Sequence, residues 1–194
     1  RTQKPPYPRA VARLTRYLVP QVRRDLLQNM VFVAGPRQVG KTTLARSLPG
    51  AKAGYLSWDV PADRERILRG ELPPGRLWAF DEILYDARPR GQRILVTGSA
   101  RLDFYRFGGD SLQGRYHLLR LHPLSVAELG VTSPGGLEDL LALGGFPEPF
   151  FRGSATESRR WSREYRQRLV SEEVSSLGRV QDLGALETQM LRLP

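Results

Sequence analysis

Short apolar runs recur along the first two thirds of the chain, and most of them end in glycine, proline or a polar residue. Runs of this kind, with β-branched and aromatic members, are typical of buried strands. They predict strands at residues 31–34, 54–59, 77–82, 93–100 and 116–121. Helical spacing predicts helices over residues 43–48 and 61–68. Strands that alternate with helices indicate an α/β fold with a parallel sheet flanked by helices.

The segments on either side of this core have helical spacing. Residues 9–28 predict a helix that is broken at Pro20 and carries Arg16 on its polar side. Further helices are expected at residues 124–129, 136–143 and 156–177, with a turn at residues 144–150. The expected division is a helical lead-in (1–28), an α/β core (29–123), and a helical lid with the start of a truncated C-terminal region (124–194).

One stretch between a predicted strand and a predicted helix fits the phosphate-loop pattern G-x-x-x-x-G-K-[ST]. Glycines at both ends let the backbone wrap a phosphate with its N–H groups pointing inward, and the following helix adds its positive end. Lys41 is expected to reach the β- and γ-phosphates, and the Thr42 hydroxyl to bind Mg²⁺. The candidate nucleotide-binding residues are Gly35, Pro36, Arg37, Gln38, Val39, Gly40, Lys41, Thr42 and Thr43. The alternative is a glycine-rich surface loop.

Two carboxylates end the predicted strand at residues 77–82. Asp81 and Glu82 follow an apolar run, and in ATPases the first such acid holds Mg²⁺ while the second polarises the attacking water. The next apolar run ends in small polar residues that include Thr97 and Ser99. A hydroxyl there is expected near the γ-phosphate or the water, and a turn or helix cap is the alternative.

The connection between these two strands is short. Only the nine residues 84–92 lie between the strand that ends in Asp81 and Glu82 and the run that starts at Arg93. A crossover between parallel strands takes about a dozen residues or more and usually includes a helix. The spacing therefore predicts that a segment is absent after Ile83.

Amino-acid composition and charge limit the kinds of site, location and partner that the protein can have. The 194 residues contain no cysteine, which excludes disulfides and thiolate metal sites. No apolar run is long enough for a membrane span and no signal peptide is evident, so a cytoplasmic protein without membrane contact is expected. The net charge of +10 favours a nucleic-acid or acidic partner, or alternatively a solvated arginine-rich surface. His117 and His122 lack metal-ligand spacing and are expected to be structural.

Taken together, the motifs resemble the prokaryotic AAA-type ATPases that carry a C-terminal domain of unknown function. The resemblance rests on GPRQVGKTTLARSL, on LSWDVPADRERILRGELPPGRLWAFDEI, on the TGS element in RILVTGSARLDF, and on LALGGFPEPF. It implies a P-loop NTPase fold of the additional-strand type with a small helical lid. It also implies Mg²⁺ binding by Asp81, catalysis by Glu82, a sensor at Ser99 and an arginine finger at Arg115 that acts in trans in a homo-oligomer. The chain departs from the family pattern by its short stretch after DEI.

These observations predict an ATPase with ATP and Mg²⁺ as cofactors, in which Lys41 and Glu82 serve hydrolysis and ATP turnover does conformational work on a protein or nucleic-acid client. One alternative is a slow, nucleotide-gated switch that binds nucleic acid or protein. Another is a phosphotransferase, which needs a pocket for an acceptor. The adjacent pair of acids favours hydrolysis.

Overall fold

The structure is a computed structural model that describes residues 14–83, 91–98 and 116–169 of the chain. The chain forms two compact units, Ala12–Gly130 and Val131–Pro194, the second together with Arg1–Val11. Among the described residues, the first unit holds every strand and the second holds three helices.

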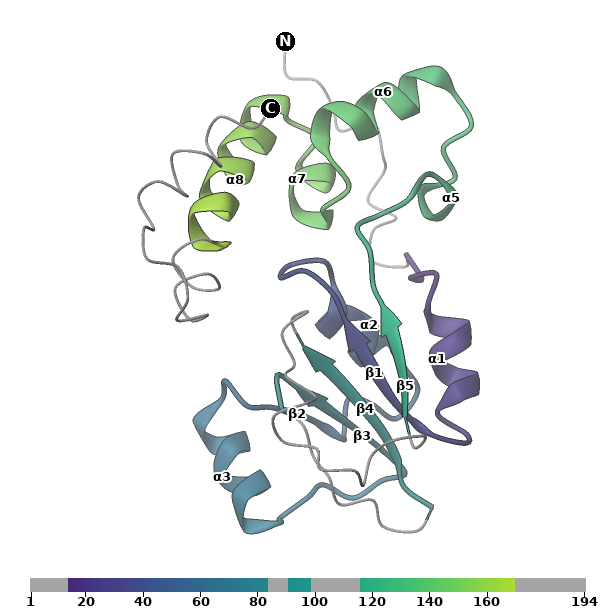
Figure 1. Cartoon of the computed structure of the whole chain (residues 1–194), viewed down its shortest axis with the longest axis vertical. Helices are drawn as coiled ribbons and strands as arrows, with labels where there is room; N and C mark the ends of the chain where they lie inside the picture. Colours follow the sequence, from purple (N-terminus) through teal and green to yellow (C-terminus); the bar gives the residue numbers. More distant parts are fainter. Residues whose placement is uncertain (1–13, 84–90, 99–115, 170–194) are drawn as a thin grey trace. The chain divides into compact units, whose positions relative to one another are not determined.

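Five parallel strands form the sheet of the first unit (Figure 1). They are β1 (Met30–Ala34), β2 (Tyr55–Ser57), β3 (Leu77–Asp81), β4 (Arg93–Gly98) and β5 (Tyr116–Arg120). Their order is β2-β3-β4-β1-β5, so β4 lies between the strand before the phosphate loop and the strand that ends in Asp81. This inserted strand defines the additional-strand type of P-loop NTPase fold, and the fold expected from the sequence is confirmed.

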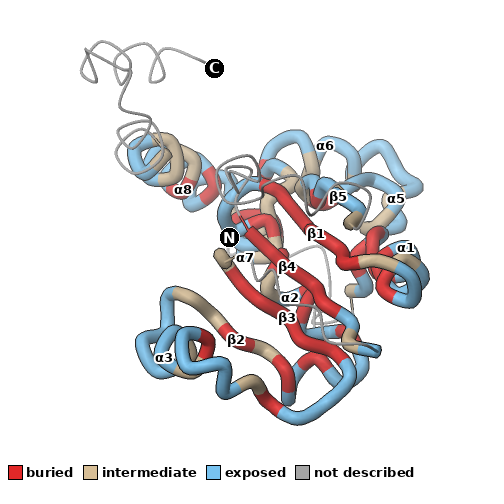
Figure 2. Tube along the Cα trace, turned by 60° about the horizontal axis from the view of Figure 1, so that its bottom comes forward, coloured by how far each residue is buried: buried red, intermediate tan, exposed pale blue. Residues whose placement is uncertain are grey.

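The strand register explains why apolar and polar chemistry separate on the sheet. On one face, Phe32 pairs with Val96, which pairs with Phe80, which pairs with Leu56. These side chains form the centre of the core, and none is accessible to solvent. β1 and β3 are buried along their whole length (Figure 2), as expected for inner strands of a parallel sheet with both faces covered.

The other face brings polar groups into one row. The register aligns Val33 with Thr97, Thr97 with Asp81, and Asp81 with Ser57. Side chains on adjacent parallel strands in register point to the same face, so Thr97 and Asp81 face the same way. Helix α2 contacts β3 and β4. The row therefore sets a carboxylate and a hydroxyl side by side at the carboxyl end of the sheet.

The described residues of the first unit include the helices α1 (Val19–Asp25), α2 (Lys41–Ser47), α3 (Pro61–Arg69) and α5 (Val126–Leu129). Pro20 lies in the first turn of α1. A proline at that position lacks only an N–H that has no helical partner, so it is suited to the start of a helix. The helical pattern predicted over residues 9–28 is therefore interrupted at Pro20 as expected, but the described residues 14–18 ahead of α1 are not helical. Arg16 was also misplaced, because its side chain is buried.

The second unit contains α6 (Pro134–Leu143), α7 (Pro147–Arg152) and α8 (Ala155–Arg168). The turn predicted for residues 144–150 is wrong from Pro147 onward, because Pro147 starts a helix for the same reason that Pro20 does. Trp161 and Tyr165, one turn apart on α8, stack at 4.8 Å, and Phe146 packs on both rings. The buried Ser158 hydroxyl donates to the Leu143 carbonyl over 2.7 Å and ties α8 to the end of α6.

The connection between β3 and β4 is the place where a missing segment was predicted. The two strands are parallel neighbours, with Asp81 aligned to Thr97. Most of the connection, residues 84–90, lies outside the described residues, so the absence of a segment after Ile83 stays a prediction. Within the described ranges, no helix has the length and apolar character needed to cross a membrane.

Candidate phosphate and magnesium site

The loop after β1 is shaped by close backbone packing. A Cβ on Gly35 would lie 2.5 Å from the Leu121 carbonyl oxygen, which is closer than real Cβ contacts come. Leu121 follows β5, and its N–H donates to the Ala34 carbonyl over 2.8 Å. Glycine at position 35 therefore lets the end of β5 lie directly against the start of the loop.

Two residues of this loop have a backbone in the left-handed conformation. Gln38 has a φ of 60° and Gly40 a φ of 99°. Glycine accepts this region without strain, whereas a non-glycine residue there costs on the order of 1 kcal/mol. Across the described ranges, Gln38 and Glu82 are the non-glycine residues with positive φ. Both belong to the set that the sequence singled out, and strained backbone of this kind concentrates at functional sites.

Lys41 begins α2, and its side chain turns back across the loop. Its Nζ donates to the Gly35 carbonyl over 3.0 Å and to the Pro36 carbonyl over 2.9 Å. The residue is only 7% exposed. An ammonium group held on two carbonyls of the loop gives this segment a positive charge, which attracts an anion.

Three hydroxyls converge on the Asp81 carboxylate. Thr42 Oγ1 donates to Oδ2 over 2.9 Å, Thr97 Oγ1 donates to Oδ1 over 2.5 Å, and the Tyr55 hydroxyl donates to Oδ2. Thr97 arrives through the strand register, Thr42 from the first turn of α2, and Tyr55 from β2. Asp81 forms no ion pair with the described residues, so its nearest polar partners are neutral oxygens. A carboxylate surrounded by hydroxyl oxygen atoms is a suitable set of ligands for Mg²⁺. This ion is commonly held by one or two carboxylates plus phosphate oxygens.

Tyr55 was not predicted from the sequence. Burial, the hydrogen bond to Asp81 and the negative charge of Asp81 raise the pKa of the Tyr55 phenol to about 12. The Arg46 guanidinium lies 4.3 Å from the centre of the Tyr55 ring. Tyr55 therefore remains a proton donor to Asp81 throughout the neutral pH range.

Glu82 follows β3 directly and leaves the strand conformation, with a φ of 58°. Its N–H donates to the Thr97 carbonyl over 2.7 Å, so its backbone is held to β4. Because of the positive φ, the Glu82 side chain does not continue the alternation of side chains along β3. Asp81 and Glu82 thus occupy different backbone environments. The first is buried beside hydroxyls, and the second is partly exposed.

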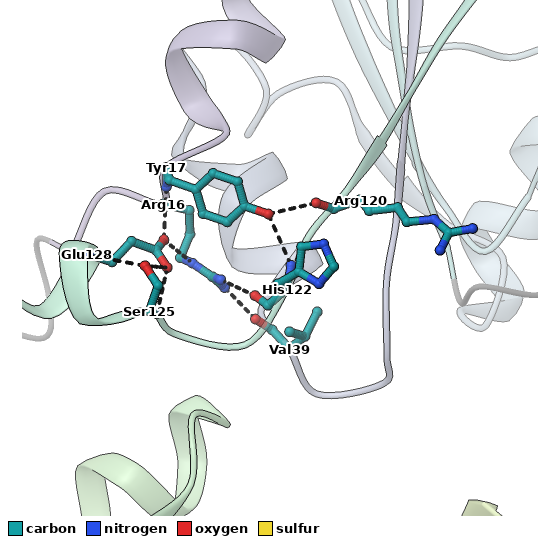
Figure 3. Close-up of polar contacts among 7 residues, drawn as sticks. All are labelled: Arg16, Tyr17, Val39, Arg120, His122, Ser125 and Glu128. Atoms are coloured by element: carbon teal, nitrogen blue, oxygen red, sulfur yellow. Dashed lines mark hydrogen bonds and ion pairs between the residues drawn. The ribbon is translucent and has the colours of Figure 1, made fainter. Parts of the chain in front are cut away.

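Arg16 is a further residue at the loop that sequence patterns missed. It is 5% exposed, and its guanidinium donates to the carbonyl of Val39 inside the loop (Figure 3). Its other partners are His122 and Glu128, both more than a hundred positions away in the sequence. Helical spacing assigned Arg16 to a polar face, and no local signal indicates partners so distant.

The remaining predicted site residues divide into two groups. Ser99 and Arg115 lie outside the described residues. His117 Nε2 pairs with the Asn29 side-chain amide over 2.9 Å, and the His122 backbone contacts Arg16 and Tyr17. Among described residues, no three His, Cys, Asp or Glu side chains gather into a metal-binding cluster.

The strand order and the loop sequence together define a P-loop NTPase fold of the additional-strand type. Residues 27–130, more than half of the chain, match the family model described as an AAA domain. The chain therefore belongs to the AAA-type ATPase family, and the resemblance seen in its motifs is confirmed.

Two curated bacterial proteins are similar to the chain. They are the uncharacterized protein Rv2008c of Mycobacterium tuberculosis and the uncharacterized protein Mb2031c of Mycobacterium bovis. Each is 30% identical to the chain over 166 residues, an alignment that covers 77% of the chain. The chain spans 37% of the length of these relatives.

Proposed function

We propose that the chain binds ATP with Mg²⁺ at the carboxyl end of the sheet and hydrolyses it. The observation that carries this proposal is the 2.9 Å hydrogen bond between the Thr42 hydroxyl and the Asp81 carboxylate, beside the Lys41 ammonium in its glycine-bounded loop. Membership of the AAA-type ATPase family supports the same function. The proposal implies the cytoplasm, where ATP is available.

Each residue has a role that its chemistry suits. Lys41 exchanges its contacts with the Gly35 and Pro36 carbonyls for phosphate oxygens, which neutralise the ammonium better than neutral carbonyls do. Thr42 and Asp81 hold Mg²⁺ through hard oxygen atoms. When bound, the metal ion neutralises phosphate charge and polarises the phosphoryl group.

Glu82 is the general base of this proposal. Its carboxylate accepts a proton from the water that attacks the γ-phosphorus, the β–γ phosphoanhydride bond breaks, and ADP and phosphate leave, while Asp81 keeps its contacts with hydroxyls. The turned backbone at Glu82 supports this assignment, because strain at the end of a strand is retained where it aims a functional side chain. Ser99 and Arg115 are proposed as the sensor and as a finger supplied by a neighbouring copy.

The proposal is tested by comparing wild type with Lys41→Ala and Glu82→Gln. Lys41→Ala is expected to weaken ATP binding by about 100-fold or more, because it removes the one ammonium group of the loop at residues 35–43, the group that is proposed to contact the phosphates. Glu82→Gln is expected to bind ATP normally and to lower the hydrolysis rate by about 100-fold or more. Binding is measured by calorimetry and hydrolysis by phosphate release.

Lys52→Ala is the matched control for Lys41→Ala, since Lys52 is an exposed lysine in the turn after α2. It is expected to behave as wild type in both assays. Equal hydrolysis by wild type and Glu82→Gln would show that Glu82 is not the general base. Unchanged ATP binding in Lys41→Ala would show that the loop at residues 35–43 is not the phosphate-binding site.

A slower, nucleotide-gated binding function is the second candidate. It is favoured by α8, which carries several solvent-exposed arginines, of which Arg160 is paired with Glu164 over 2.8 Å. A switch of this kind turns ATP over slowly and binds DNA in a strongly salt-dependent manner. A hydrolysis rate that rises with protein concentration and is lost in Arg115→Ala favours an assembling ATPase over the switch.

A further inference from the structure

Arg16 joins three separate segments of the first unit. Its Nε donates to Glu128 Oε1 over 2.8 Å, and its two terminal nitrogens donate to the carbonyls of Val39 and His122 (Figure 3). The side chains of Arg16 and Glu128 are 6% and 3% exposed. A planar guanidinium suits this role, because its donors point in several fixed directions at once.

The contact with Val39 constrains the phosphate loop directly. Val39 lies between Gln38 and Gly40, both in the left-handed conformation, and its side chain is fully buried. In a trans peptide, the carbonyl of one residue and the N–H of the next point in opposite directions. By holding the Val39 carbonyl, Arg16 therefore directs the Gly40 N–H away from itself.

Gly40 also packs against Arg16. A Cβ on Gly40 would lie 3.2 Å from Nη1 of Arg16, which is tighter than most real Cβ contacts. The left-handed φ of Gly40 and the nearby guanidinium thus act on the same peptide. Both fix the direction of a backbone amide in the loop that we propose binds phosphate.

Glu128 connects this arrangement to α5. Its Oε1 also accepts from the Tyr17 N–H over 2.9 Å, and its Oε2 accepts from the Ser125 N–H over 3.2 Å. The Glu128 N–H donates to Ser125 Oγ over 3.2 Å, which completes a capping box at the start of α5. The same carboxylate therefore caps α5 and neutralises the arginine that holds the loop.

Tyr17 gives the arrangement a second attachment to the sheet. Its hydroxyl donates to the Arg120 carbonyl over 2.7 Å and accepts from the His122 N–H over 3.2 Å. Arg16 and Tyr17 together therefore hold the chain after β5 in a fixed position beside the loop. Movement of α5 away from this position breaks contacts that keep Arg16 at Val39.

We propose that Arg16 is a positioning residue of the phosphate loop, and that through Glu128 it couples nucleotide binding to the docking of α5. This inference rests on the proposed nucleotide binding by residues 35–43. Coupling of two equilibria is reciprocal, so a nucleotide that requires the held loop also stabilises docked α5 by the same factor. The loop and α5 then respond together when nucleotide binds or leaves.

The test uses the whole chain and the double variant Arg16→Met/Glu128→Gln. Removing one charge leaves the other buried and unpaired, whereas removing both avoids that penalty. Glutamine keeps the capping box of α5. The double variant is therefore expected to be less destabilised than Glu128→Gln alone, yet to bind ADP with Mg²⁺ at least about tenfold more weakly.

A purely structural role predicts the opposite pattern, in which ADP affinity recovers together with stability. The matched control is Arg160→Met/Glu164→Gln. It removes a different arginine–glutamate pair, which lies on α8, and is expected to bind ADP as wild type does. Arg16→Lys provides a second variant that retains the positive charge. A lysine ammonium does not reproduce the fork to two carbonyls, so its ADP affinity is also expected to fall.

Hydrogen exchange supplies the second readout. The amides of residues 126–130 are expected to exchange about tenfold more slowly with ADP bound in wild type, and to show no such change in the double variant. Wild-type ADP binding with no added protection of α5 overturns the coupling. Wild-type affinity in both the double variant and Arg16→Lys overturns the positioning role. A wild-type chain that does not bind ADP overturns the proposed function itself, and this inference with it.

Discussion

Two buried carboxylates lie near the phosphate loop in opposite electrostatic surroundings. Asp81 is contacted by the hydroxyls of Thr42, Tyr55 and Thr97 and has no ion pair with a described residue. Glu128 is paired with the Arg16 guanidinium at 2.8 Å. One carboxylate is surrounded by neutral donors, and the other is already neutralised by a cation from the chain.

The difference separates the carboxylate that we propose binds Mg²⁺ from a structural one. Neutral hydroxyl donors orient the Asp81 carboxylate without cancelling its charge, so the group keeps its attraction for a metal ion. Glu128 has no such capacity, because Arg16 and three backbone or hydroxyl donors occupy both of its oxygens. Its charge stabilises the fold at α5 instead.

The largest expected effect on stability comes from Glu128→Gln. This substitution leaves the Arg16 charge buried without its counterion, which costs about 3 kcal/mol in the free energy of unfolding. Asp81→Asn leaves no cation without a counterion, so it is expected to cost no more than about 1 kcal/mol in the free energy of unfolding. Urea unfolding of both variants measures the contrast, and equal losses would mean that the two carboxylates do not differ as described.

The pH dependence of unfolding sharpens the same contrast. Burial raises the pKa of Glu128, but the hydrogen bond from Arg16, the backbone donors and the Arg16 charge outweigh burial and lower the pKa below its ordinary value of 4.5. The unfolded chain then takes up a proton more readily than the native one. The stabilisation from Glu128 is therefore complete above pH 4.5 and is lost as the pH falls through the lowered native pKa.

The control for this pH effect is the Glu128→Gln variant itself. Its free energy of unfolding is expected to fall less steeply with acid than that of wild type, since one carboxylate that favours the native state is gone. Parallel acid limbs in the two proteins would show that Glu128 has the same pKa in the native and unfolded chains.

Sequence patterns located the sheet because its strands are nearly continuous apolar runs. They also located the loop and Asp81, since those residues lie within one short motif or at a strand end. Arg16 escaped prediction because its partners are 23, 106 and 112 positions away. Helix α7 was missed because Pro147 was interpreted as part of a turn, although proline is equally suited to a first helical turn.

The smallest effect is expected for Tyr55→Phe, which removes one of the three donors to Asp81. The loss is about 0.5 kcal/mol in the free energy of unfolding, because the carboxylate keeps two hydroxyl donors. The raised pKa of about 12 means that the native protein retains a phenol proton that the unfolded chain releases near pH 10. Wild-type stability should therefore fall between these pH values, and this part of the decline should be absent in Tyr55→Phe.

Spectroscopic titration of the tyrosines checks the assignment without unfolding the protein. The wild type should contain a phenol that ionises near pH 12, and Tyr55→Phe should lack it. A wild-type titration with every tyrosine near its ordinary pKa would contradict the hydrogen bond from Tyr55 to Asp81.

The most direct test of the central claim is calorimetric titration of wild type and Asp81→Asn with ATP, in the presence of Mg²⁺ and in its absence with EDTA. If Asp81 is the metal-binding carboxylate, Mg²⁺ should tighten ATP binding to wild type by about tenfold or more, and this gain should vanish in Asp81→Asn while the affinity in EDTA is retained. A gain from Mg²⁺ that persists in Asp81→Asn, or no gain in wild type, would contradict the account.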